Sequence, residues 1–130
     1  MRFIKLLLVI VFVGTACSAY AQKQNLRSMI DMANHGTEDT IQVNLLISIC
    51  DSLFRVKPEE TLQYGSKALE LSKKLNFRKG EAYALKYLGM AYFVHAEYES
   101  SAHYFQDALE IFEIIKDKKG TANMLSNQRS

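Results

Sequence analysis

The sequence resembles itself when it is displaced by 40 residues, and this self-similarity limits the folds that the chain can adopt. The matched pairs are Leu45 and Leu85, Glu59 and Glu99, Tyr64 and Tyr104, Ala68 and Ala108, Leu69 and Leu109, and Gly80 and Gly120. No gap is needed, and a small alanine recurs where chance similarity between amphipathic helices would not select one. A repeat of this length is typical of a unit that buries its apolar face only against neighbouring copies.

Each repeat has the residue sizes of two antiparallel helices in contact. Gly89 and Ala108 are small and mark where the backbones approach, while Leu85, Tyr92 and Phe105 fill the space around the crossing. The composition favours one helix-rich domain, since 48% of residues are apolar, 23% are charged and one is proline. We therefore predict an all-α fold, with helices near residues 24–34, 39–55, 58–75, 78–94, 98–115 and 118–127.

Local signals mark the ends of these helices. We expect Gly36 to end the first helix in a left-handed conformation, and the polar residues up to Asp39 to cap the next one. Pro58 is expected to open a helix, because the missing N–H of proline has no partner in a first turn anyway. Asp117 is a suitable N-cap for the last helix.

The second repeat also matches a known motif. The matching residues are Leu85, Leu88, Gly89, Tyr92, Ala96, Tyr98, Phe105, Ala108 and Leu109, at relative positions 4, 7, 8, 11, 15, 17, 24, 27 and 28. This spacing resembles the tetratricopeptide (TPR) unit. The 40-residue period is similar to the long repeats in exported N-terminal sensor regions of Bacteroidetes histidine kinases and related regulators. The resemblance implies an α-solenoid of antiparallel helix pairs, with about two full repeats and a partial third.

Five segments are expected along the chain. They are a signal peptide at 1–21, a short helix and linker at 22–37, an irregular first repeat at 38–77, a second repeat at 78–117 and a truncated third repeat at 118–130. In the first repeat Ser48, Ile49, Ser52 and Gly65 depart from the TPR pattern, as terminal units often do. Because the third repeat stops early, we expect a thin cover over Phe112 and a chain that is a piece of a longer regulator.

The N-terminus has the layout of a secretory signal. Arg2 and Lys5 precede an apolar run at 6–13, and small residues end in Ala21, so we expect cleavage between Ala21 and Gln22 and export to the periplasm. Two alternatives stay open, an uncleaved membrane anchor and a lipoprotein anchored at Cys17. Cleavage would leave 14 basic and 14 acidic residues of the original 16 and 14, so charge gives no indication of nucleic-acid binding.

No catalytic constellation can be assembled from the sequence. His35, His95 and His103 have no companion at a convincing metal-ligand spacing, and His103 with Asp107 forms at most a solvated surface pair. Phosphate-binding, dinucleotide-binding and nucleophile-elbow motifs are absent. Cys50 fits a small buried hydrophobe better than a reactive thiol. We therefore predict a protein that is not an enzyme and that uses neither a cofactor nor a metal.

The remaining source of function is a surface. The TPR resemblance implies a concave groove lined by the first helix of each repeat, with candidate partner-binding residues Leu46, Cys50, Tyr83, Lys86, Met90 and Phe93. The predicted function is an exported, non-enzymatic module that binds a peptide, a helix or another protomer. The alternative is the detached sensor portion of a histidine kinase or related regulator. A purely structural reading also stays open, in which Tyr83 and Phe93 pack on the N-terminal helix or on absent repeats.

Overall fold

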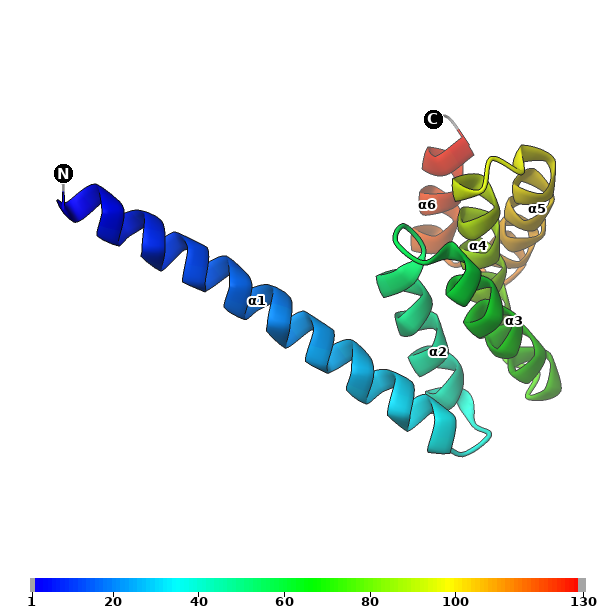
Figure 1. Ribbon diagram of the computed structural model, residues 1–130. Coiled ribbons are helices and arrows are strands. Elements are labelled where there is room, and N and C mark those ends of the chain that lie inside the picture. The colour runs from blue at the N-terminus through cyan, green and yellow to red at the C-terminus, as the bar shows by residue number, and fades with distance from the viewer. Residues whose placement is uncertain (1, 129–130) are drawn as a thin grey trace. The chain divides into compact units, whose positions relative to one another are not determined.

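Residues 2–128 form six helices in the computed structural model, with side chains described for residues 2–126 (Figure 1). The helices are α1 (Arg2–His35), α2 (Thr40–Leu53), α3 (Pro58–Lys74), α4 (Arg78–Val94), α5 (Tyr98–Ile114) and α6 (Lys118–Gln128). The described residues contain no strand, so the all-α prediction is confirmed. The expected bounds of α2 to α6 agree with the observed ones to within two residues.

The chain divides into two units between Asn34 and His35, and each is described here by itself. The first unit lies within α1, a single helix of 34 residues. The predicted helix at 24–34 is therefore the last part of a longer helix, and the predicted cleavage point after Ala21 lies inside it. The side chains of residues 3–13 are exposed, and most of them are apolar.

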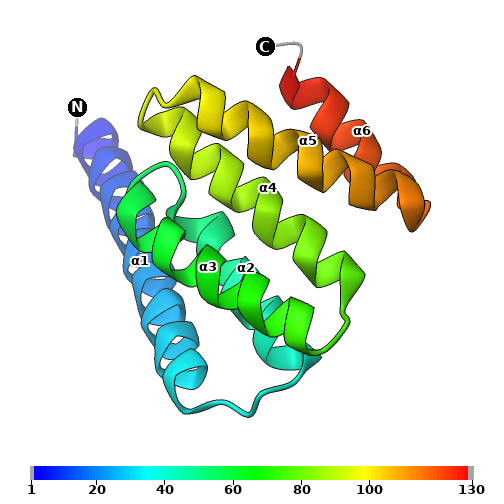
Figure 2. The same ribbon diagram turned by 90° about the vertical axis from the view of Figure 1, so that its right-hand side faces the viewer.

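The helices of the second unit pack in chain order. Each of α2 to α5 contacts the helix that follows it, and α2 also contacts α4. Figure 2 shows α4 lying between α3 and α5. The main buried cluster consists of Ala82, Leu85, Phe105, Ala108, Leu109, Ile111, Phe112 and Met124. Ala68 and Ala108, which match at the 40-residue offset, are both fully buried, so the two copies use the same position for close helix packing.

Three turns of this unit share one hydrogen-bond pattern. After α3, the N–H of Asn76 donates to the carbonyl of Lys73 (3.2 Å), and the N–H of Phe77 donates to the carbonyl of Ser72 (2.8 Å). This is the Schellman arrangement, which satisfies carbonyls that the helix itself leaves open. The turns after α4 and α5 repeat it, so the same loop recurs at a spacing of 20 residues.

The residue at the centre of each of these turns is left-handed and is not glycine. Asn76, Ala96 and Lys116 have φ angles of 53°, 61° and 57°. The prediction that Gly36 is left-handed is wrong, because no glycine in the described part of the chain has a positive φ. The packing of the turns therefore sets these helix ends. Glycine, which adopts the left-handed conformation most easily, does not occupy any of the three positions.

Two aspartates cap helices as predicted. An oxygen of the Asp39 carboxylate accepts the N–H of Gln42 at 2.9 Å, and Asp117 Oδ1 accepts the N–H of Gly120 at 3.0 Å. Pro58 opens α3, where the preceding residue Lys57 has no side-chain cap.

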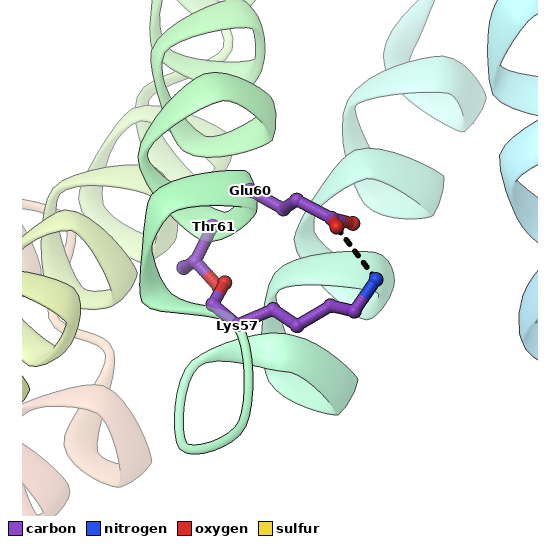
Figure 3. Close-up of polar contacts among 3 residues, drawn as sticks. All are labelled: Lys57, Glu60 and Thr61. Atoms are coloured by element: carbon purple, nitrogen blue, oxygen red, sulfur yellow. Dashed lines mark hydrogen bonds and ion pairs between the residues drawn. The ribbon is translucent and has the colours of Figure 1, made fainter.

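The first turn of α3 is held by a different contact. Figure 3 shows the Lys57 ammonium directed at the Glu60 carboxylate. The distance between Lys57 Nζ and Glu60 Oε1 is 2.6 Å. The Thr61 hydroxyl donates to the Lys57 carbonyl at 3.2 Å. An acidic side chain in a first turn also suits the positive end of the helix dipole.

The two repeats exchange large and small residues at their helix crossings. A Cβ placed on Gly89 would lie 2.6 Å from the Phe105 ring, so the small residue is on the first helix of the pair and the large one on the second. At the matched positions of the first repeat, Ile49 is large and fully buried, while Gly65 is small and buried. A Cβ on Gly65 would lie 2.9 Å from the Leu88 side chain of α4, so the small residue of the first repeat leaves room for the second repeat.

Helix α6 packs on α5 and completes the core at its C-terminal side. Phe112 and Met124 are fully buried, and a Cβ on Gly120 would collide with the Phe112 ring. The expectation that the Phe112 side is thinly covered is therefore wrong, because this part of the third repeat is enough to bury it. The last two residues of the predicted segment 118–130 lie outside the described part of the chain.

Candidate interaction surface on α2 and α4

Two cationic and three aromatic side chains form a row of contacts across the end of α2 and the middle of α4. The Arg55 guanidinium lies 5.0 Å from the centroid of the Phe54 ring, which lies 6.0 Å from the Tyr87 ring. The Lys86 ammonium lies 5.1 Å from the Tyr87 centroid and 5.7 Å from the Tyr83 centroid. We call these five residues the cation–aromatic ladder. Such contacts are attractive because the face of an aromatic ring is electron-rich.

One hydrogen bond fixes the middle of the ladder. The Tyr87 hydroxyl donates to a carboxylate oxygen of Asp51 at 2.6 Å, joining α4 to α2. Burial and this hydrogen bond raise the pKa of Tyr87 well above its ordinary value. The ring is therefore neutral and fixed in orientation at physiological pH, and it offers a stable face to the neighbouring Lys86.

Lys86 is the cation between the two tyrosine rings of the ladder. The side chain is half-buried, and burial lowers the pKa of its ammonium, with the charge of Lys119 acting in the same direction and that of Asp51 opposing it. In the described part of the chain it forms no ion pair or hydrogen bond, and its neighbours are two tyrosine rings. Its three N–H donors are therefore free for a ligand.

The Tyr83 end of the ladder packs against the core. The Tyr83 ring meets the fully buried Phe112 ring edge to face, with centroids 5.0 Å apart. Burial, followed by the charge of Asp117, raises the pKa of the Tyr83 hydroxyl. Because Phe112 is held by α5 and α6, the orientation of Tyr83 depends on packing that lies behind the surface.

The predicted groove residues separate into two groups. Tyr83 and Lys86 are neighbours in the ladder, and Met90 is half-buried on the same side of α4 by helical spacing. Phe93 is 53% exposed and contacts the Tyr98 ring, at the end of α4. Phe93 is therefore exposed and Lys86 half-buried, whereas Tyr83 and Met90 are half-buried and also pack against the core cluster.

Leu46 and Cys50 belong to the core and do not line a surface. Leu46 is 4% exposed, and Cys50 is fully buried with its thiol directed at the Thr61 carbonyl, 3.8 Å away. Burial raises the pKa of the Cys50 thiol to about 12. Helix α2 turns these residues toward α3, so the side of α2 that the TPR resemblance assigns to the groove is closed here.

Sequence reasoning missed Asp51, Arg55 and Tyr87. Asp51 and Tyr87 directly follow residues that the sequence does single out, namely Cys50 and Lys86. They lie 36 residues apart, so no local spacing pairs them. The 40-residue period would have aligned Asp51 with Ala91 instead, which gives no indication of a contact.

A separate open depression of about 400 Å³ lies beside α5. It is lined by Tyr92, Ser100, His103, Tyr104 and Asp107. The rings of Tyr92 and Tyr104 stack nearly parallel with centroids 5.2 Å apart, and burial raises the pKa of Tyr104. His103 and Asp107 are both exposed at its rim, in agreement with a solvated pair.

A second depression, of about 210 Å³, also includes Asp107 and continues along α5 to Ile114.

His95 lies 3.6 Å from the Glu59 carboxylate, a contact that sequence spacing did not suggest. Among the described residues no three His, Cys, Asp or Glu side chains are grouped so that they could hold a metal ion.

Comparisons with known proteins give no relative for this chain. No family model, no curated protein and no solved structure matches it. Helix α1 is long and apolar enough to cross a membrane, and a signal sequence shares this property. The function is therefore argued from the chain alone.

Proposed function

We propose that this chain is an exported, non-enzymatic interaction module of the TPR-like solenoid type. In this proposal the α2 and α4 side of the repeats receives a segment of a protein partner. The observation that carries the proposal is the cation–aromatic ladder, in which rigid rings flank an ammonium group that lacks a polar partner. Tyrosine is typical of binding hot spots, because its ring offers a large contact area at low conformational cost.

Three regularities support the solenoid reading. Successive helices pack in chain order, and α2 reaches past α3 to contact α4. The Schellman turns recur at a spacing of 20 residues, so each helix and its loop fill half of a 40-residue period. The positions Ala68 and Ala108 are buried in both copies. Stacked helix pairs of this kind present a concave binding surface, to which α4 contributes here because the corresponding side of α2 is buried.

Export is supported by α1. Two basic residues, Arg2 and Lys5, precede its apolar segment. The large apolar side chains of that segment are exposed, which is unfavourable in water. The intact mass of the protein recovered from the periplasm tests this part of the proposal. A chain that starts at Gln22 supports cleavage, a lipidated Cys17 indicates an anchored form, and a mass that includes Arg2 excludes both.

Site-specific photocross-linking tests the binding role. A photoreactive amino acid at Met90 is expected to capture a periplasmic partner that the same group at the exposed Ser66 of α3 does not capture. The double variant Tyr83→Ala/Lys86→Glu should abolish the adduct at Met90. The matched control is Tyr64→Ala/Lys67→Glu, because Lys67 also lies over a tyrosine ring, 5.8 Å away, but on α3. Equal adducts from both double variants would refute the proposal.

A further inference from the structure

We infer that the partner presents an acidic side chain to Lys86, with an apolar group beside it that contacts the half-buried Tyr83 ring. This inference rests on the proposed function and specifies the chemistry of the partner. It differs from what the sequence favours, which is an apolar helix or strand on an apolar groove. The observations that carry it are the free donors of Lys86, the absence of an ion pair between Lys86 and the nearby carboxylates, and the excess of cations around the ladder.

The donors of Lys86 are the first observation. The ammonium is held over two rings, which attract it but accept no conventional hydrogen bond. A partly buried charge without a hydrogen-bonded counter-ion is unfavourable, and binding of an uncharged segment would bury it further. A carboxylate satisfies the same group by a charge-assisted hydrogen bond, which is stronger where water is excluded. The site therefore discriminates between an acidic segment and a neutral one.

The carboxylates near the ladder are only partly satisfied by other groups. One oxygen of Asp51 accepts the Tyr87 hydroxyl, and Asp117 Oδ1 accepts the Gly120 N–H, while the buried Asp117 Oδ2 has no hydrogen-bond partner among the described residues and lies 3.9 Å from the Lys79 ammonium. Neither forms an ion pair with Lys86, although Asp51 is near enough to influence its pKa. An internal salt bridge therefore does not compete with an incoming carboxylate.

Cations exceed carboxylates around the ladder. Arg55, Lys79, Lys86 and Lys119 lie within or beside it, against Asp51 and Asp117. This surplus attracts an acidic segment and repels a basic one, which favours both encounter and selectivity. The half-buried Tyr83 ring beside Lys86 gives apolar contact to a residue that flanks the acidic one, while the Tyr87 ring is buried.

A peptide selection tests this inference without a known partner. The full chain, kept in mild detergent because α1 exposes apolar side chains, is immobilised and used to select from a displayed library of random peptides. The selected peptides should be enriched in Asp and Glu next to apolar residues. One such peptide is then synthesised twice, once as selected and once with each acid replaced by its amide.

Binding of the two peptides is measured by fluorescence anisotropy for the wild type and for three variants. We expect the amide peptide to bind about tenfold more weakly or worse, a difference of about 1.4 kcal/mol. Lys86→Met should lose the preference for the acidic peptide, Lys86→Arg should retain most of it, and Lys67→Met on α3 should bind like the wild type. Unfolding curves establish that each variant is folded.

The outcomes separate the inference from the proposed function. Selected peptides without acidic enrichment, bound in a way that depends on Tyr83 but not on the charge of Lys86, would overturn the inference and leave the proposed function standing. Absence of any enriched peptide, or binding unchanged in both Tyr83→Leu and Lys86→Met, would overturn both.

Discussion

The hydroxyl of Tyr87 in α4 donates a 2.6 Å hydrogen bond to the carboxylate of Asp51 in α2. This bond joins the first helices of two successive repeats on the side where the cation–aromatic ladder lies. It also orients the ring beside which the Lys86 ammonium is held. Tyr87 therefore affects both the stability of the fold and the geometry of the binding surface, and mutation can separate these two effects.

Replacement of Tyr87 by phenylalanine is expected to lower the free energy of unfolding by about 1 kcal/mol, because a hydrogen bond to a charged group is lost while the ring remains. Denaturant titration measures this. In a double-mutant cycle with Asp51→Ala, the coupling energy should be about 0.5 to 1.5 kcal/mol. A coupling near zero would mean that the bond contributes nothing to stability.

High pH should destabilise the protein through the same residue. Burial and then the hydrogen bond to Asp51 raise the folded pKa of Tyr87 above its unfolded value of 10.0. The neutral phenol is favoured by the fold, so its contribution is complete below that value and is lost as the pH rises above it. Urea unfolding between about pH 8 and pH 11 should show a steeper loss for the wild type than for Tyr87→Phe. Parallel curves would contradict the assignment.

Cys50 should be protected from alkylation in the folded protein. Its side chain is fully buried and the pKa of its thiol is raised to about 12, so little thiolate exists at neutral pH. In a Cys17→Ser variant, reaction with a thiol reagent should follow the unfolding of the helices and accelerate with denaturant. Rapid labelling in native buffer would instead support a reactive thiol.

Glycine at a left-handed turn position should stabilise the protein. Ala96 has a φ of 61°, which costs a residue with a Cβ about 1 kcal/mol or more relative to glycine. We expect Ala96→Gly to raise the free energy of unfolding by up to about 1 kcal/mol. The control is Ala102→Gly in α5, which should lower it by about the same amount because it lies inside a helix. Equal losses in both would contradict the turn geometry.

The helix crossing at Gly89 should not tolerate a side chain. A Cβ there would lie 2.6 Å from the Phe105 ring, so Gly89→Ala is expected to cost about 1 to 3 kcal/mol. The double variant with Phe105→Leu should recover part of this loss, because a smaller side chain leaves room for the methyl group. Thermal or denaturant unfolding measures both. No recovery in the double variant would place the strain elsewhere.

The sequence predicted the helical part of the fold well, because its signals are local or periodic. The bounds of α2 to α6 follow from amphipathic spacing, from Pro58 and from two capping aspartates. The 40-residue offset also located buried Ala68 and Ala108. These features depend on residue type and spacing, which the sequence contains directly.

The candidate site was predicted in part. Tyr83 and Lys86 were identified from the motif, but Leu46 and Cys50 were assigned to the groove although they are buried. A motif position fixes where a residue lies on its own helix and not what another helix places over it. The sequence already marks Ile49 and Gly65 as departures from the repeat pattern, but only the packing reveals that Gly65 lies against Leu88 of α4.

By itself the sequence determined the class of fold, the order of the helices and the apolar character of the N-terminus, because backbone preference and hydrophobic periodicity act over a few residues. Only the tertiary structure decided that Asp51 meets Tyr87 and that Lys86 is held between two rings without a counter-ion. The physical reason is that these contacts depend on how two helices, separated by a third along the chain, rotate against each other to fill a shared core.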